Sequence, residues 1–279
     1  MSQLTAASTT KSARRVMEIL ELFDQERRPM SLKEVCDRLS LAPSSGLGLL
    51  KSLVFVGYLE YDKGSRTYLP TMKIALLGSW VADGMFSRMN IVPIMEHARD
   101  VSGETIFLGT RSDLYTQYVH VLTGGDVDRT IIPPGTIRPL ARTGIGHLFL
   151  SLLNDRDLEY TVRRLNLSEP DRSLRVPYEG VYKSVSTIRT QGYVYSRNRF
   201  HTDSGIIAVL LPVAPFNRTL AIGLGGPTVR LDANLEDYLR ILREARDAVG
   251  RFAATTADAS PSVAPASHGE PPTVPETTR

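Results

Sequence analysis

The sequence predicts an α+β protein with two folded parts: an N-terminal winged helix-turn-helix domain and a larger C-terminal domain of helices around an antiparallel sheet. Three observations lead to this prediction. Three short helical patterns and one hairpin pattern follow one another within residues 12–70. Apolar or alternating strand patterns recur in the second half, and 279 residues are too many for one small domain.

The first two helices are expected over residues 12–25 and 32–39. In the first helix, the apolar residues Val16, Ile19, Leu20 and Phe23 recur with helical spacing. Ser31 and Glu34 have the spacing of a capping box, which places the start of the second helix just after Ser31. Its inner face would carry Leu32, Val35 and Leu39.

A third helix is expected to begin at Pro43 or Ser44 and to end at Gly57. Its inner face would consist of Gly46, Leu49, Leu50, Leu53 and Val54. The run "YLEYDKGSRTYLP" then predicts a strand, a turn and a second strand. Three helices followed by a hairpin indicate a winged helix-turn-helix, with Lys63 and Arg66 at the tip of the wing.

The whole chain is predicted to divide into five segments. They are a disordered N-terminus (1–11), the winged helix-turn-helix domain (12–70), a linker and dimerisation helix (71–90), the C-terminal domain (91–254) and a disordered tail (255–279), which is rich in Pro, Ser, Ala and Thr. The linker helix carries an apolar stripe that could pair with a second chain, formed by Ile74, Leu77, Trp80 and Val81.

The C-terminal domain is predicted to contain helices at 91–101, 143–153, 155–165 and 178–191. Its strands are expected in "ETIFLGT", "YTQYVHVL", "DRTIIPPG", "GYVYSRN", "GIIAVLLPV" and "TLAIGLGG". Asp232 is expected to cap a last helix in which Leu235, Leu239 and Leu242 are in register.

The composition favours a soluble cytoplasmic protein without metal or cofactor. The single cysteine, Cys36, excludes an internal disulfide and a cysteine-rich zinc site, and no apolar run reaches the length of a membrane helix. The five histidines form no metal-binding spacing, and no nucleophile elbow or phosphate-binding loop is present. These absences argue against an enzyme, and a net charge of +3 permits a nucleic-acid partner.

Several segments, in this order and spacing, resemble the IclR family of bacterial transcription regulators. They are "SARRVMEILELF", "SLKEVCDRLSLAPSS", "LLKSLVFVGYLE", "RPLARTGIGHLFLSLL", "IRTQGYVYS", "GIIAVLLPV" and "AIGLGGP". The resemblance implies a winged-helix domain joined to a GAF-like effector-binding domain, assembled as a homodimer or homotetramer on a palindromic double-stranded DNA operator.

The third helix would be the recognition helix, which reads base edges in the major groove. The family usually places Ser-Thr there, then an apolar residue, a His or Tyr, and an Arg. Here Ser44 and Ser45 hold the first two places, Gly46 the third, Leu47 the fourth and Gly48 the fifth. The polar start of the motif is present and the arginine is absent.

The predicted DNA-contacting residues lie on this helix, on the two preceding helices and on the wing. They are Arg14, Arg15, Lys33, Ser44, Ser45, Leu47, Gly48, Lys51, Lys63 and Arg66. Because two glycines weaken the helix and remove base-reading groups, an alternative remains open. The chain could be a ligand-sensing or protein-interaction module whose reading of DNA sequence has degraded.

The segment "PLARTGIGHLFLSLL" suggests an anion site, because Thr143 and Gly144 open a helix and Arg142 precedes them. His147 lies one turn further on and could donate or accept a hydrogen bond. The implied ligand is a small organic acid. The opposite expectation is that Arg142 pairs with an Asp or Glu of the chain.

Five further pocket positions follow from the resemblance, namely Ser196, Arg197, Ile207, Gly223 and Gly225. Ile207 stands where the family often has Cys, and the two glycines stand where serines often contact the ligand. These differences predict a roomier, more apolar pocket that suits a larger acid, such as an aromatic one. The alternative is a pocket that is filled by its own side chains and binds nothing.

Overall fold

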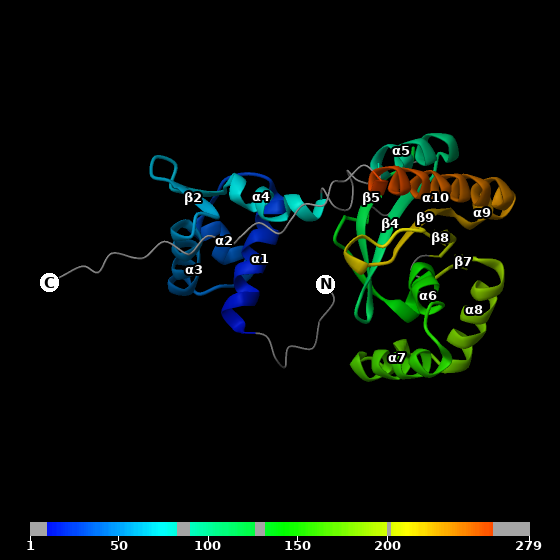
Figure 1. Cartoon of the computed structure of the whole chain (residues 1–279). Coiled ribbons are helices and arrows are strands. Elements are labelled where there is room, and N and C mark those ends of the chain that lie inside the picture. The colour runs from blue at the N-terminus through cyan, green and yellow to red at the C-terminus, as the bar shows by residue number, and fades with distance from the viewer. Residues whose placement is uncertain (1–9, 83–89, 126–131, 200–201, 259–279) are drawn as a thin grey trace.

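A computed structural model describes residues 10–82, 90–125, 132–199 and 202–258. Its N-terminal part contains three helices and a small antiparallel sheet (Figure 1). The helices are α1 (Lys11–Glu26), α2 (Leu32–Leu39) and α3 (Pro43–Phe55). The strands β1 (Met30–Ser31), β2 (Leu59–Asp62) and β3 (Thr67–Pro70) pair in the order β1-β3-β2.

Local sequence signals set the boundaries of these helices. Ser31 and Glu34 form the predicted capping box, in which the Ser31 hydroxyl accepts from the Glu34 amide and the Glu34 carboxylate accepts from the Ser31 amide. Pro43 occupies the first turn of α3, and Gly57 follows the helix with a φ of +81°. The predicted inner face of α3 is confirmed, because Gly46, Leu50 and Leu53 are buried.

The core of this part lies where the three helices meet the sheet. It contains the buried side chains of Ile19, Leu22, Phe23, Met30, Val35, Leu50, Leu53, Leu59 and Tyr68. Helix α4 (Met72–Ala82) follows, and the rest of the predicted linker helix lies outside the described residues. On α4, Leu77 and Trp80 are exposed, while Ile74 and Val81 are half-buried.

The C-terminal part is a six-stranded antiparallel sheet with helices on both faces, which confirms the predicted α+β fold. The strand order is β6-β5-β4-β9-β8-β7. The strands are β4 (Thr105–Ser112), β5 (Tyr115–Leu122), β6 (Ile137–Pro139), β7 (Tyr193–Arg197), β8 (Ser204–Leu210) and β9 (Leu220–Pro227).

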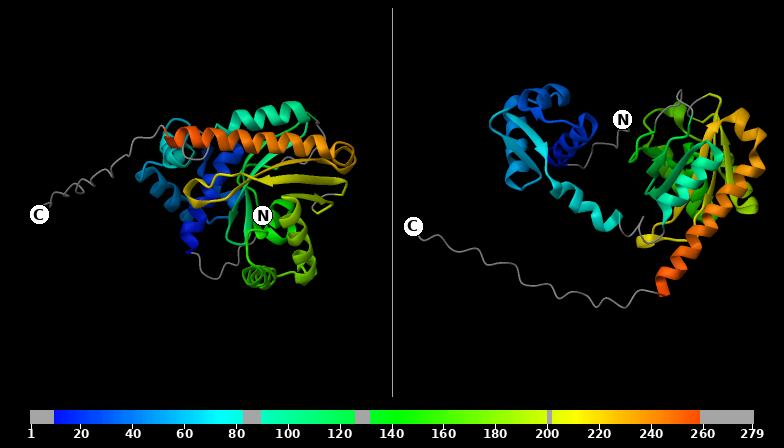
Figure 2. Two further views of the ribbon diagram at one scale, coloured as in Figure 1. Left: turned by 45° about the vertical axis from the view of Figure 1, so that its right-hand side comes forward. Right: turned by 90° about the horizontal axis from the view of Figure 1, so that it is seen from above.

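Two sets of helices cover the two faces (Figure 2). Helices α5 (Ile91–Ser102), α9 (Thr228–Ala233) and α10 (Leu235–Asp258) pack on one face around a core that includes Ile207 and Leu224. The 3₁₀ turn η2 (Leu140–Arg142) and helices α6 (Gly144–Leu150), α7 (Asp155–Ser168) and α8 (Tyr178–Gln191) form the other core with Phe107 and Ala208. We call this second side the α6 face of the sheet.

Three local predictions are wrong. Asp232 does not cap the last helix, since it lies within α9 and α10 begins at Leu235. Residues 255–258, which were expected in the disordered tail, continue α10. The segment "DRTIIPPG" is expected to be a strand, but its part from residue 132 onward is not one, and β6 begins only at Ile137.

Candidate DNA-binding and effector-binding sites

The residues of α3 that are predicted to contact DNA lie on its solvent-facing side. Ser44, Ser45, Gly48 and Lys51 are exposed and Leu47 is half-buried. A Cβ added at Gly48 would meet no atom within 4 Å, so this position is open on the surface. This side of the helix therefore presents the hydroxyls of Ser44 and Ser45, the Lys51 side chain and uncovered backbone at Gly48.

The wing carries two cations on a well-held turn. The Asp62 carboxylate accepts hydrogen bonds from the amides of Gly64 (2.8 Å) and Ser65 (3.2 Å) and from the Ser65 hydroxyl (2.6 Å), which lowers the pKa of Asp62. Lys63 and Arg66 are exposed at this turn. Since no carboxylate of the described residues forms a salt bridge with either cation, both charges are available to phosphates.

The basic residues of the first two helices differ in their exposure to solvent and in their partners within the chain. Lys33 is exposed, and Arg14 is half-exposed with its Nε 3.5 Å from Glu18. Arg15 is turned inward, because its Nη1 donates to Glu18 (2.7 Å) and to the Leu39 carbonyl oxygen (3.3 Å). Arg15 thus ties α1 to the end of α2, and this contact argues against its predicted place in the DNA interface.

In the C-terminal domain, the start of α6 lies against β7 and β8. An added Cβ at Gly144 would come within 2.8 Å of the Ser196 Cβ and of the Ile206 Cγ2, so the space beside Gly144 is filled. The Thr143 hydroxyl caps α6 by accepting from the Gly146 amide (2.8 Å) and shares a hydrogen bond with Thr116 (3.0 Å). The structure therefore brings Gly144 and Ser196 together and gives Thr143 a structural role.

His147 is buried beneath this junction, with 2% of its surface exposed. Its Nδ1 lies 2.7 Å from the Ser184 hydroxyl and its Nε2 lies 2.8 Å from the Ala141 carbonyl oxygen. Burial and the nearby Arg199 lower its pKa to about 4. The imidazole is accordingly neutral near pH 7, and the tautomer with a proton on Nε2 satisfies both contacts.

Arg199 is the functional candidate that the sequence did not reveal. Its Nε donates to the Ser196 hydroxyl (3.0 Å), and its Nη1 donates to the Ala141 carbonyl oxygen (3.2 Å) and lies 3.3 Å from Nε2 of His147. Burial lowers the pKa of this guanidinium. No carboxylate in the described part of the chain forms a salt bridge with Arg199, so its charge has no fixed counter-ion there.

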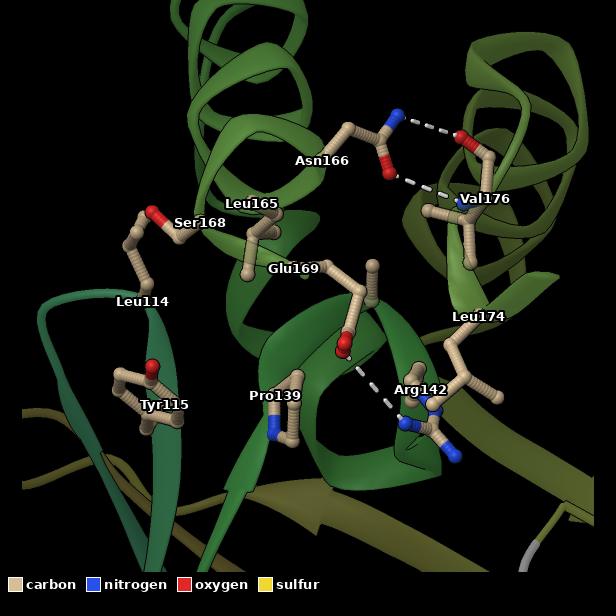
Figure 3. A pocket seen from close by; sticks show the side chains of 11 residues that line it. Leu114, Tyr115, Pro139, Arg142, Leu165, Asn166, Ser168, Glu169, Leu174 and Val176 are labelled. Carbon is tan, nitrogen blue, oxygen red and sulfur yellow. Dashed lines mark hydrogen bonds and ion pairs between the residues drawn. The ribbon is translucent and has the colours of Figure 1, made fainter. Parts of the chain in front are cut away.

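Arg142 lines a different pocket, in which its guanidinium points toward Glu169 (Figure 3). Its Nη1 lies 3.8 Å from the Glu169 carboxylate at the end of α7, in a small pocket that Leu165, Leu174 and Val176 help to line. The structure thus supports the expectation that Arg142 pairs with an acid of the chain, in a pocket whose lining includes neither Ser196 nor His147.

Two predicted pocket residues lie on the wrong face of the sheet. Ile207 belongs to the core under α5 and α10, because side chains alternate along β8. Arg197 is exposed, pairs with Asp232 and stacks on Tyr195, with 4.0 Å between its Cζ and the ring centroid. The neighbours that do face α6 are Ile206 and Ala208.

Gly223 and Gly225 face α6 as predicted, but the space beside them is occupied. An added Cβ at Gly223 would lie 3.0 Å from the Ala208 Cβ, and one at Gly225 would lie 2.6 Å from the Phe107 ring. The Phe107 ring also packs on Tyr118, with 5.4 Å between the centroids. The expected roomier pocket is therefore filled here by Phe107, Ile206 and Ala208.

The residues that the structure describes contain no group of three or more His, Cys, Asp or Glu side chains that could hold a metal ion. None of their helices combines the length and the apolar character that a membrane crossing requires.

Comparison with known proteins identifies relatives across both domains. The family model for the IclR helix-turn-helix domain matches residues 12–63. The model for the bacterial transcriptional regulator IclR C-terminal domain matches residues 85–251. The HTH-type transcriptional regulator XynR of Escherichia coli is 22% identical over 244 residues, covering 86% of this chain and 96% of XynR. The regulator BhcR of Paracoccus denitrificans is 26% identical over 227 residues, covering 79% of each chain.

Solved structures agree with these matches. The effector domain of a transcriptional regulator IclR from Acinetobacter is 27% identical, with a TM-score of 0.56 over 60% of this chain and 98% of that domain. An IclR homologue of Microbacterium hydrocarbonoxydans in complex with 4-hydroxybenzoate has a TM-score of 0.69 at 18% identity, over 88% of this chain and 100% of that one. The two family models together span most of the chain, which therefore belongs to the IclR family of bacterial transcription regulators.

Proposed function

We propose that this regulator binds a small organic acid at Arg199 and that the acid changes its affinity for a DNA operator. The observation that carries the proposal is the guanidinium of Arg199, which is solvent-exposed, is held by the Ser196 hydroxyl and the Ala141 carbonyl oxygen, and has no carboxylate partner among the described residues. An exposed guanidinium is accessible to a ligand, and arginine binds carboxylates through paired, charge-assisted hydrogen bonds.

The surroundings of Arg199 suit an acid with an apolar body. Ile206 and Phe107 line the α6 face near Ser196, and the neutral His147 adds no second charge. The Microbacterium homologue, whose structure contains 4-hydroxybenzoate, supports an aromatic acid. Because Phe107 fills the space beside Gly225, binding of an aromatic ring requires this side chain to move.

The test is calorimetric titration of the full chain with benzoate and with 4-hydroxybenzoate. Arg199→Gln should weaken binding by roughly ten- to a hundredfold, since hydrogen bonds to a charged group contribute about 1.5–3 kcal/mol. Arg142→Gln is the matched control and should titrate like the wild type, because Arg142 faces Glu169. Wild-type affinity in Arg199→Gln would refute the assignment.

On the DNA side, we propose that Ser44, Ser45, Leu47, Gly48 and Lys51 approach the major groove while Lys33, Lys63 and Arg66 contact phosphates, with Arg14 at the edge. A second copy of the chain would complete the palindromic contact, and the exposed Leu77 and Trp80 on α4 support such pairing. Lys63→Ala with Arg66→Ala should flatten the salt dependence of DNA binding. An unchanged slope would remove the wing from the interface.

One observation favours the second candidate, a protein-interaction module that no longer reads DNA sequence. The exposed face of α3 carries no arginine and ends at Phe55, whose side chain is 91% exposed. Fluorescence anisotropy with fragments selected from a genomic pool, and with scrambled duplexes, separates the candidates. Tight binding to selected fragments alone supports the regulator, while equally weak binding to both supports the interaction module.

A further inference from the structure

A second cleft of the C-terminal domain shares no residue with the Arg199 site. It is lined by Arg111 at the end of β4, by Phe149 and Leu152 at the end of α6, and by the segment Asn217–Thr219 that leads into β9. The Thr110 hydroxyl donates to the Thr219 carbonyl oxygen (3.1 Å), which fastens this segment to β4. Three separate parts of the chain thus meet in one cleft.

The charges of the cleft are unbalanced. Asp113 also lines it, but both of its carboxylate oxygens accept hydrogen bonds from Arg164, at 3.0 and 3.1 Å. Arg111 reaches only the Asp113 backbone, because its Nε donates to the carbonyl oxygen (2.9 Å). Burial lowers the pKa of Arg111, the nearby Asp113 carboxylate raises it in part, and Arg164 lowers it. Neither Arg111 nor Arg218 forms a salt bridge with a carboxylate of the described residues, and the one carboxylate that lines the cleft is bound by Arg164.

An apolar wall adjoins these cations. Leu152 is 55% exposed although it borders the buried Phe149, so apolar surface faces the solvent beside two guanidinium groups. Pockets that combine apolar surface with a few fixed polar groups are typical of small-molecule sites. A bare inorganic ion would use the cations and leave the apolar wall uncovered.

We propose that this cleft is a second ligand site, which takes a small oxyanion with an apolar body. The carboxylate or phosphate group would lie between Arg111 and Arg218, and the apolar body would cover Leu152. The cleft borders the linker helix, because Phe216 precedes Asn217 and packs edge-on against Trp80 of α4 with 5.3 Å between the ring centroids. A ligand in the cleft is thus placed beside the contact between this domain and α4.

The test is calorimetric titration of the full chain with benzoate and, separately, with inorganic phosphate. Wild-type protein should bind benzoate at two sites per chain. Arg111→Gln with Arg218→Gln should weaken one of them by roughly tenfold or more. The control pair Arg156→Gln with Arg163→Gln removes two exposed charges of α7 and should titrate like the wild type. Because Arg111 is half-buried, the single exposed variant Arg218→Glu repeats the test without a risk to folding.

The outcomes separate this inference from the proposed function. Loss of one site in the cleft variants and of the other in Arg199→Gln supports both. Loss in the cleft variants alone supports the second site and contradicts the role of Arg199. Isotherms of the cleft variants that superimpose on the wild type, or no binding of either probe, would overturn the inference. Phosphate binding at the cleft would show that the oxyanion suffices, and benzoate binding alone would show that the apolar body is required; each supports the site.

Discussion

Helix α3 and the α6 face of the sheet both carry glycines, but the space beside these glycines is open in α3 at Gly48 and occupied on the α6 face. At Gly48 of α3 an added Cβ would meet nothing within 4 Å. At Gly225 it would meet the Phe107 ring at 2.6 Å, and at Gly144 it would meet Ser196 and Ile206 at 2.8 Å. A glycine in a sequence therefore opens space only where no distant segment fills it.

The largest expected change in stability comes from a substitution on the α6 face of the sheet, where side chains fill the space beside the glycines. Phe107→Ala removes a side chain that is only 7% exposed and should lower the free energy of unfolding by about 3–5 kcal/mol. It should also open the space beside Gly225, so that benzoate recovers part of the lost stability. Denaturant unfolding with and without benzoate measures both effects.

Phe55→Ala is the matched control for Phe107→Ala. Phe55 is 91% exposed, so its removal should change the free energy of unfolding by less than about 0.5 kcal/mol. Equal losses of unfolding free energy for the two variants would contradict the difference between the filled α6 face and the exposed surface of α3.

His147, which is buried on the α6 face, should make the stability of the protein depend on pH. Its pKa is about 4 in the folded protein and about 6.5 in an unfolded chain, so the unfolded state binds more protons between these values. Stability should therefore fall as the pH drops below about 6.5 and stop changing from this cause below about 4. The total loss should be about 3 kcal/mol.

The contribution of His147 to the pH dependence of stability is the difference between the wild type and His147→Gln. Unfolding free energies of the wild type and of His147→Gln are compared from pH 7 to pH 4, so that the other titrating groups cancel. The wild type should show the steeper loss. Parallel curves would mean that His147 is not buried as described.

Within α3, the two glycines allow a closer comparison. Gly46→Ala places a Cβ 2.4 Å from the Sγ of Cys36 and should destabilise the winged helix by about 1–3 kcal/mol. Cys36→Ala removes that sulfur, so the double variant should be more stable than the sum of the two single changes predicts. Thermal unfolding of the four proteins gives the coupling, and simple additivity would contradict the contact.

Gly48→Ala should have a smaller effect than Gly46→Ala, and of the opposite sign. An exposed helix interior gains about 1 kcal/mol when alanine replaces glycine, and nothing near Gly48 opposes the new methyl group. Denaturant unfolding should show this gain. A loss of stability would mean that the position is covered.

The difference between the regions also explains which predictions from the sequence are correct. The faces of α1 and α3 follow from local spacing, and the capping box at Ser31 and Glu34 depends on contacts within one turn. In β8 the side chains alternate, so Ile207 points to the opposite face from its neighbours Ile206 and Ala208, and a shift of one residue is enough to misplace a pocket position.

The residues of the proposed effector site that the sequence did not reveal depend on long-range contacts. Arg199 lies in a turn after β7 and meets Ala141 and His147, which are more than fifty residues away along the chain. Phe107 reaches Gly225 across the pairing of β4 with β9. No periodicity or spacing marks such partners, because tertiary packing alone brings them together.

The central claim is that an acid bound at Arg199 changes the affinity for DNA, and fluorescence anisotropy tests it most directly. An operator fragment selected from a genomic pool is titrated with the full chain, with and without benzoate, for the wild type, Arg199→Gln and Arg142→Gln. We expect benzoate to shift the operator affinity of the wild type and of Arg142→Gln and to leave that of Arg199→Gln unchanged. The same shift in Arg199→Gln as in the wild type, or no shift in any of the three proteins, would contradict the account.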